Sequence, residues 1–233
     1  MSRANVKDKR KAQLIAAALE SIAKRGLMET TITHISKGAG MSRGIINFYF
    51  TSKEMMLRET LKTLIDEYEA EWGEAIAKAG DAGRARLDAM LRVHFDKKLC
   101  SARRLNVMSA FWGHAATQSA YRAQLEAADA KLETALQAAL AHALSSSLEE
   151  AAHAATQLHA LIRGLWLNYM LNPQGVAREA LLAEATSFVD RLAGAPIRIV
   201  KDSEKPAAAA KPKPKPKADE PKQLDIEDLF AVR

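Results

Sequence analysis

The sequence predicts an all-α protein, and two observations carry that prediction. Apolar residues recur at intervals of three and four over most of residues 8–193, and alanine, the strongest helix former, is abundant. No segment sustains the strict alternation of apolar and polar residues that is typical of a half-buried strand. Because hydrophobic residues make up 48% of the 233 residues, the chain can bury a real core in one medium domain or two small ones.

The helices are expected in a clear order along the chain. The first begins near residue 8 and ends at Gly26, since glycine often closes a helix. Short helices fill residues 31–50, and a long helix runs from Thr51 to about residue 78, with Thr51 and Glu54 as a capping box. Further helices are expected at about 84–95, 103–113, 121–144, 149–171 and 176–192.

Residues 31–50 contain the signals of a helix-turn-helix. Thr31 and Ser42 each precede a short helical run, so both are expected to cap a helix N-terminus. Gly40 lies between the runs, where a left-handed backbone conformation is easiest for glycine. On the second helix, Ile46 and Phe50 lie four residues apart and are expected to face inward. This arrangement predicts a DNA-binding motif whose second helix enters the major groove.

The outward face of that second helix carries side chains that suit DNA. Arg43 and Asn47 are four residues apart, and they can pair with guanine or phosphate and with adenine, respectively. Gly44 leaves room for a close approach, and Tyr49 offers a hydroxyl to the DNA backbone. Lys53 opposes the dipole at the start of its own helix, which a bound phosphate would explain. A solvated surface without DNA is the alternative, and the pattern alone leaves both open.

Both ends of the chain are basic. The formal net charge is +6, and residues 201–222 hold seven lysines against four acidic residues. Basic ends indicate a polyanionic partner such as DNA, although the same charges would also serve solubility. The segment after residue 200 is rich in lysine and proline and is expected to be an extended linker. The acidic and apolar sequence QLDIEDLFAVR follows it as a candidate docking helix.

The stretch TTITHISKGAGMSRGIINFYFTSKEMM, residues 30–56, resembles the signature of the TetR family of transcriptional regulators. One departure is Asn47, which stands where the family usually has tyrosine. The run GIINFYF is instead similar to the BetI-type, choline-responsive branch of the family, and GLWLN at residues 164–168 resembles the C-terminal domain of that branch. The residues that match the family signature are Thr30, Thr31, Ile35, Ala39, Gly40, Ser42, Gly44, Ile46, Phe50, Ser52 and Lys53.

The resemblance implies a homodimer that represses transcription from a palindromic double-stranded DNA operator. Residues 1–50 would form the helix-turn-helix domain, residues 51–196 the ligand-binding and dimerisation domain, and residues 197–233 a disordered Lys/Pro-rich tail with a short C-terminal motif. By carry-over from the family, DNA contacts are expected at Thr31, Thr33, Ser42, Arg43, Gly44, Asn47, Tyr49 and Lys53.

The resemblance also implies a small-molecule effector, which the choline-responsive branch suggests is a small cation. A quaternary ammonium has no hydrogen-bond donors and binds the faces of tryptophan and tyrosine rings. Aromatic residues of the second half are therefore candidate ligand contacts, although such residues more often belong to an ordinary core. The candidates are Phe111, Trp112, Trp166 and Tyr169.

Other kinds of site find little support in the sequence. Cys100 is the only cysteine, which excludes an internal disulfide and a cysteine-cluster metal site. His153 and His159 are six residues apart, a poor spacing for metal ligands on one helix. No nucleophile or phosphate-loop motif is present, so we expect neither an enzyme nor a cofactor. Without a signal peptide or an apolar run near the roughly 20 residues that span a bilayer, a cytoplasmic protein with no membrane partner is expected.

A second class of function is a helical interaction module without sequence-specific DNA binding. In that reading the helical body presents its basic tail and the sequence LDIEDLF to protein partners. Salt-sensitive binding to one promoter fragment, but not to random DNA, would separate the two classes.

Overall fold

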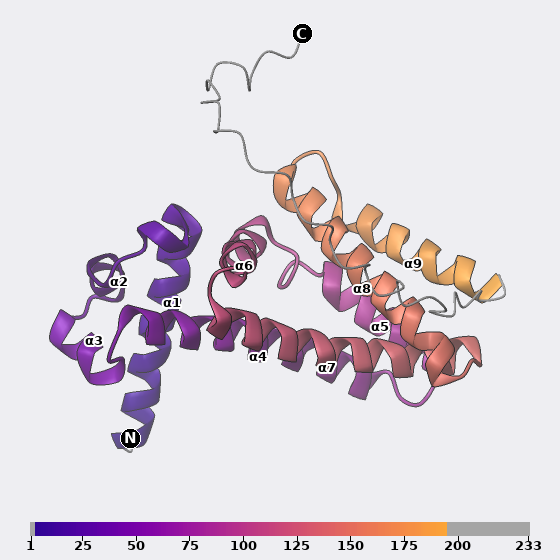
Figure 1. Ribbon diagram of the computed structural model, residues 1–233, viewed down its shortest axis with the longest axis horizontal. Helices are drawn as coiled ribbons and strands as arrows, with labels where there is room; N and C mark the ends of the chain where they lie inside the picture. Colours follow the sequence, from indigo (N-terminus) through magenta and orange to yellow (C-terminus); the bar gives the residue numbers. More distant parts are fainter. Residues whose placement is uncertain (1–2, 195–233) are drawn as a thin grey trace, which may run out of the picture. The chain divides into compact units, whose positions relative to one another are not determined.

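Figure 1 shows the computed structural model of the chain, which describes residues 3–194. The all-α prediction is confirmed, because this part of the chain forms helices and contains no strand. None of the described helices is both long and apolar enough to cross a membrane. The helices are α1 (Arg3–Glu29), α2 (Ile32–Ala39), α3 (Arg43–Tyr49), α4 (Lys53–Lys78), α5 (Gly83–Phe95), α6 (Ala102–Ala115), α7 (Ser119–Leu144), α8 (Leu148–Leu171) and α9 (Arg178–Gly194).

The first three helices pack around a small apolar core. Leu14 and Ala18 of α1 meet Ile35 of α2, Ile46 of α3 and Phe50, and each of these side chains is at most 2% exposed. The short helices depend on this packing, because isolated helices of 8 and 7 residues are marginal in water.

The predicted ends of α2 and α3 are confirmed. Oγ1 of Thr31 accepts a hydrogen bond from the His34 N–H at 3.2 Å, and Oγ of Ser42 accepts one from the Ile45 N–H at 3.4 Å. Gly40 closes α2 in the left-handed conformation, with φ 63° and ψ 32°. Each cap pairs a backbone group that the end of a helix would otherwise leave unpaired.

Two predicted boundaries in the first half differ from the structure. The first helix begins at Arg3 rather than near residue 8. Gly26 interrupts it as predicted, with a non-helical backbone at φ 81° and ψ 170°, and a further short helical segment after this kink extends α1 to Glu29. The capping box predicted at Thr51 is wrong, because Ser52 caps α4 by accepting from the Met55 N–H at 3.0 Å. The Thr51 hydroxyl instead donates to the sulfur of Met55. Serine and threonine are both good caps, so adjacent candidates could not be separated from the sequence.

The later helices form a bundle in which α5, α7, α8 and α9 contribute to one core. Its centre holds leucine and isoleucine side chains that are at most 1% exposed: Leu91, Leu132, Leu136, Leu158 and Ile162. The bounds of α5 to α9 agree with the predicted ranges to within two residues. The predicted domain boundaries stay predictions, and the Lys/Pro-rich tail with LDIEDLF lies outside the described residues.

A polar cluster lies inside this bundle around His94. The Tyr68 hydroxyl and the His94 Nε2 are 2.6 Å apart, and the His94 Nδ1 is 2.6 Å from the Met90 carbonyl oxygen. Nε1 of Trp166 donates to the His94 carbonyl at 2.8 Å. Because the Met90 carbonyl can only accept, Nδ1 carries the proton and Nε2 accepts from Tyr68. The neutral imidazole is therefore fully paired, and a second proton would break the bond from Tyr68.

This cluster predicts a fold that loses stability in acid. Burial lowers the pKa of His94 from 6.5 to about 4, so between these pH values the unfolded chain binds a proton that the folded chain does not. The free energy of unfolding should fall as pH drops through this window, by up to about 3 kcal/mol, and this contribution should be complete above it. Urea titrations at a series of pH values measure the effect.

The variant His94→Gln removes the titrating group and should flatten this part of the pH dependence. A matched control is His153→Gln, which replaces an exposed histidine on α8 and should leave the slope as it is. An unchanged slope in His94→Gln would mean that the acid sensitivity arises elsewhere.

Candidate DNA interface and ligand cavity

The outward face of α3 is a polar surface. Arg43, Gly44 and Asn47 are exposed, whereas Ile46 and Phe50 are buried in the core. Since Arg43 and Asn47 lie one turn apart on the same face, their side chains can reach neighbouring base edges in a major groove. The structure thus brings together the central residues of the predicted DNA site.

The threonine and serine residues of the predicted site have structural partners. Thr31 and Ser42 use their side-chain oxygens as acceptors for helix caps, which leaves each hydroxyl proton available to a phosphate. Thr33 lies on α2 and accepts a hydrogen bond from Nη2 of Arg43. This bond links the two helices of the motif.

Tyr49 is the last residue of α3, and Lys53 lies just after it at the start of α4. Lys53 is the first residue of α4, and its Nζ donates to the Met28 carbonyl at 3.2 Å, a partner that the sequence did not reveal. Tyr49 is partly buried, and its ring meets that of Phe48 edge-on with centroids 5.3 Å apart. The DNA contacts of Lys53 and Tyr49 stay predictions.

Phe48 is a candidate that the sequence analysis did not single out. Its side chain is 74% exposed on α3, next to Asn47. A large apolar side chain that is left in solvent on a polar helix face is typical of a contact surface. A signal was available, because the buried positions Ile46 and Phe50 place residue 48 outside their stripe on a helix.

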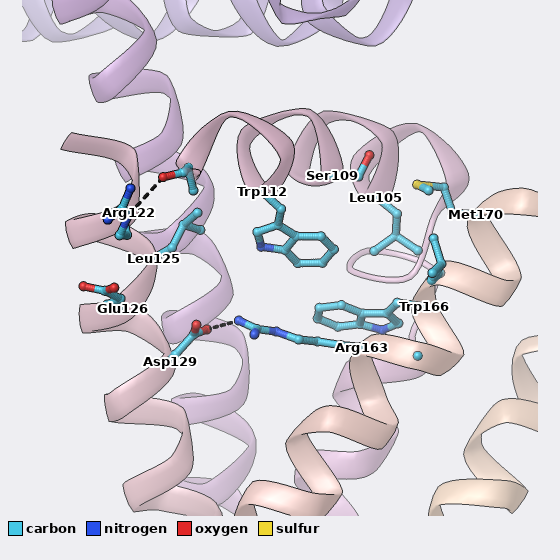
Figure 2. A pocket seen from close by; sticks show the side chains of 13 residues that line it. Leu105, Ser109, Trp112, Arg122, Leu125, Glu126, Asp129, Arg163, Trp166 and Met170 are labelled. Carbon is cyan, nitrogen blue, oxygen red and sulfur yellow. Dashed lines mark hydrogen bonds and ion pairs between the residues drawn. The ribbon is translucent and has the colours of Figure 1, made fainter. Parts of the chain in front are cut away.

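A cavity of about 510 Å³ is lined by residues of α6, α7 and α8 (Figure 2). A cavity of this volume is in the range that holds small molecules. Its aromatic and charged lining residues are Trp112, Arg122, Glu126, Asp129, Arg163 and Trp166.

Two of the four predicted ligand contacts line this cavity. Trp112 lies on α6 and Trp166 on α8, and Figure 2 shows both rings beside the same space. Phe111 is instead fully buried in the core between α4, α6 and α7. Tyr169 does not line the cavity, and its hydroxyl accepts a hydrogen bond from Arg178 at 3.3 Å. Ligand roles for Phe111 and Tyr169 stay predictions that the cavity lining does not support.

The two arginines of the cavity have partners within the protein. Arg163 pairs with the Asp129 carboxylate across the α7–α8 contact, and its guanidinium carbon lies 5.6 Å from the ring centroid of Trp112. Arg122 donates to two backbone carbonyls at the C-terminal end of α6, at 3.0 and 2.7 Å. Glu126 is exposed. The cavity therefore combines two aromatic faces with charges of both signs.

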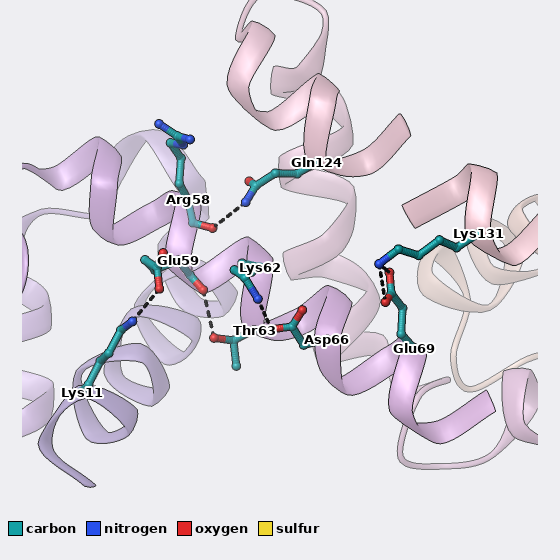
Figure 3. A network of polar contacts seen from close by, with 9 residues as sticks. All are labelled: Lys11, Arg58, Glu59, Lys62, Thr63, Asp66, Glu69, Gln124 and Lys131. Carbon is teal, nitrogen blue, oxygen red and sulfur yellow. Dashed lines mark hydrogen bonds and ion pairs between the residues drawn. The ribbon is translucent and has the colours of Figure 1, made fainter. Parts of the chain in front are cut away.

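Polar contacts tie α4 to the helices on either side of it (Figure 3). Lys11 of α1 pairs with Glu59 at 2.6 Å, and Lys131 of α7 pairs with Glu69 at 2.8 Å. Exposed pairs of this kind contribute at most about 1 kcal/mol each to stability. Apolar packing, rather than these ion pairs, is therefore what holds α4 in position.

No group of three potential metal ligands occurs within residues 3–194. His159, one of the two histidines considered from the sequence, has its Nδ1 3.0 Å from a Glu133 carboxylate oxygen.

Models of two protein families match the chain. Residues 14–60 match "Bacterial regulatory proteins, tetR family", and residues 83–194 match "BetI-type transcriptional repressor, C-terminal". The first match contains the exposed face of α3, and the second contains the cavity.

Individual relatives agree with these matches. The HTH-type transcriptional regulator BetI of Burkholderia mallei (strain NCTC 10229) is 33% identical over 192 residues, which cover 82% of this chain and 97% of that protein. A solved transcriptional regulator from Rhodococcus sp. Rha1 is 27% identical with a TM-score of 0.68, over 78% of this chain and 94% of that one. A regulator from Saccharomonospora viridis, solved in complex with choline, shares the fold at 19% identity with a TM-score of 0.67, over 79% and 97%.

The curated relatives are regulators rather than enzymes, and their similarity extends over most of the chain, including both candidate sites. This favours a DNA-binding regulator over an interaction module without sequence-specific DNA binding. The chain belongs to the TetR family of DNA-binding transcriptional regulators and carries a BetI-type C-terminal domain.

Proposed function

We propose that the protein is a ligand-responsive repressor that binds a palindromic operator as a homodimer in the cytoplasm. The observation that carries this proposal is the exposed face of α3, where Arg43, Asn47 and Phe48 lie in solvent. In helix-turn-helix proteins the second helix of the motif is the one that reads base edges. The cavity supports a response to a ligand, because it offers a space of suitable size away from the DNA-binding helices.

The outward side chains of α3 read different features of DNA. Asn47 can form two hydrogen bonds with adenine, and Arg43 can pair with guanine or with a phosphate. The exposed ring of Phe48 can contact a thymine methyl group. At the start of α4, Lys53 and the free backbone N–H groups can together hold a phosphate.

The first prediction for DNA binding concerns base preference. Asn47→Ala should weaken operator binding by about 1–3 kcal/mol and relax the preference at one base pair of each half-site. Phe48→Ala should relax a preference for thymine at a neighbouring position. The operator is found by footprinting DNA that flanks the protein's own gene, and fluorescence anisotropy with single base-pair variants measures both effects.

Lys53→Ala provides the contrast, because a phosphate contact carries no base preference. It should weaken binding to all sequences alike and reduce the slope of log affinity against log salt by about one. If Asn47→Ala and Phe48→Ala both keep the wild-type base preference, the proposed reading face of α3 is wrong.

A homodimer is supported by an apolar stripe on α8 that is not covered by the rest of the described chain. The stripe follows helical spacing through Ala160, Gly164, Leu167 and Leu171, and all four residues are exposed. Leu167 is 48% exposed and Leu171 is 72% exposed, and a contiguous exposed apolar patch, unlike a single exposed leucine, is typical of an interaction site. Two-fold pairing of this face with a second copy would match a palindromic operator.

The prediction is that Leu171→Glu gives a folded monomer. Because the side chain is exposed in the single chain, the substitution should not disturb the fold, but it would place two carboxylates in the pairing face. Leu148→Glu is the matched control, since Leu148 is 60% exposed on another side of the same helix. Light scattering should report a monomer for the first variant and a dimer for the second. A dimeric Leu171→Glu would exclude this face.

A small cation is the effector that the cavity suits best. Trp112 and Trp166 offer ring faces, and Asp129 and Glu126 supply negative charge. Choline is bound by the Saccharomonospora viridis neighbour, which has the same fold. Because a ligand can release DNA only if it binds the DNA-incompetent state more tightly, the effector must prefer a different placement of the two recognition helices.

The prediction for the effector is that millimolar choline lowers operator affinity and raises the melting temperature. Trp166→Leu should weaken choline binding by about 2- to 30-fold, which corresponds to the loss of one cation–π contact. Trp166→Phe is the matched control, because both variants lose the hydrogen bond to His94 but phenylalanine keeps an aromatic face. If neither choline nor glycine betaine has any effect, a choline-like effector is excluded while the family assignment stands.

A further inference from the structure

Arg163 lies where a cationic ligand would be expected to bind. Its side chain leaves α8 and passes below the ring of Trp112 toward Asp129 on α7 (Figure 2). The guanidinium carbon is 5.6 Å from the centroid of the Trp112 ring, and the guanidinium pairs with the Asp129 carboxylate. An aromatic face and a carboxylate are the two groups that attract a small organic cation, and in this structure one arginine uses both.

These contacts are weak enough to be exchanged. The Arg163 side chain is 39% exposed and that of Asp129 is 32% exposed, so water screens the charge of both partners. An exposed cation–π contact and an exposed ion pair each change an equilibrium constant by less than about tenfold. Asp129 also has a second neighbour, since its Oδ1 lies 3.7 Å from Nε2 of His159. This separation is longer than a hydrogen bond, so Arg163 is the closer partner of the carboxylate.

Arg163 also belongs to the wall of a second, smaller cavity. This inner space has a volume of about 40 Å³, and its lining includes Trp112, Asp129, Arg163 and Trp166, which also line the larger cavity. The inner space additionally reaches Ile65 and Tyr68, which lie on α4. The arginine therefore lies in the wall shared by the ligand-sized cavity and the space that reaches α4.

We propose that Arg163 is an internal competitor of the cationic effector. Without effector, its guanidinium covers Trp112 and neutralises Asp129. The effector's cationic group replaces it at both, and the released side chain moves toward solvent. This inference rests on the proposed cationic effector. It adds that the affinity for the effector depends on how much more strongly the effector's cationic group interacts with Trp112 and Asp129 than the Arg163 guanidinium does.

The test measures binding of tetramethylammonium to the full-length protein by isothermal titration calorimetry at constant ionic strength. This probe has a cationic centre but no carboxylate or hydroxyl, so it reports the cation site only. Arg163→Gln replaces the internal cation with a shorter, neutral polar side chain, and the dissociation constant of this variant should be about 5- to 30-fold lower than that of the wild type. Arg163→Lys restores a cation and should return affinity toward the wild-type value.

The matched control is Arg122→Gln, which removes one positive charge from the same cavity without uncovering a ring. Arg122 donates to backbone carbonyls rather than to a carboxylate, and no ring contact by it is present in the described segment. Its effect on tetramethylammonium binding should be at most about twofold, as expected for a screened charge. Circular dichroism melting curves establish that each variant is folded.

The outcomes separate the two proposals. If the wild type binds tetramethylammonium and Arg163→Gln binds it equally or more weakly, Arg163 is not a competitor, while the cationic effector stands. If Arg122→Gln and Arg163→Gln raise the affinity for tetramethylammonium equally, the loss of one positive charge from the cavity explains the effect. That result would also overturn the inference. If neither the wild type nor Arg163→Gln binds the probe, the cationic effector and the competitor role fail together.

Discussion

The structure depends on the burial of one face of α4 in three separate cores. Met56 packs with α1, α2 and α3; Leu61 packs with Phe111 of α6; and Tyr68 packs against the core that α5, α7, α8 and α9 share. A helix rises about 1.5 Å per residue, so the residues from Lys53 to Tyr68 span about 22 Å. Because the helix is continuous over these residues, a displacement of its later turns would also displace its first turn, which packs against α1, α2 and α3.

This constraint connects the cavity with the first three helices through α4. The lining of the inner space includes Ile65 and Tyr68, which lie on α4, and Tyr68 is in turn hydrogen-bonded to His94. Trp166, which lines the cavity, donates to the backbone of the same histidine. A ligand that moves Trp166 therefore acts on a fully paired polar cluster, which tolerates few alternative arrangements because an unpaired buried polar group is costly.

The sequence predicted the helices and the exposed face of α3 well because local signals specify them. Caps at Thr31 and Ser42 and the left-handed turn at Gly40 depend on neighbouring residues, and all three are found where expected. The cap of α4 was misplaced by one residue, since Thr51 and Ser52 carry equivalent signals. Phe48 was missed because an aromatic residue in an apolar run is ordinarily assigned to the core.

The ligand cavity could be predicted only in part. Aromatic side chains on α6 and α8 are visible in the sequence, but whether a ring faces a cavity or a core depends on the rotation and packing of its helix. Trp112 and Trp166 line the cavity, whereas the side chain of the neighbouring Phe111 is buried in a core. The approach of Arg163 to Asp129 joins residues 34 positions apart, and no local spacing indicates it.

Three cations at the candidate sites already have partners inside the protein. Arg43 donates to Thr33, Lys53 donates to the Met28 carbonyl, and Arg163 pairs with Asp129. Under the proposed function, each cation must exchange or share that partner when DNA binds or when a ligand enters the cavity. The net affinity for DNA or for ligand would then be the difference between two similar interactions, which keeps it modest. A modest affinity suits a ligand-responsive repressor, because a coupling of about 1–3 kcal/mol raises the dissociation constant for DNA by about 5- to 150-fold. Such a change releases DNA only when the protein concentration is not far above the dissociation constant.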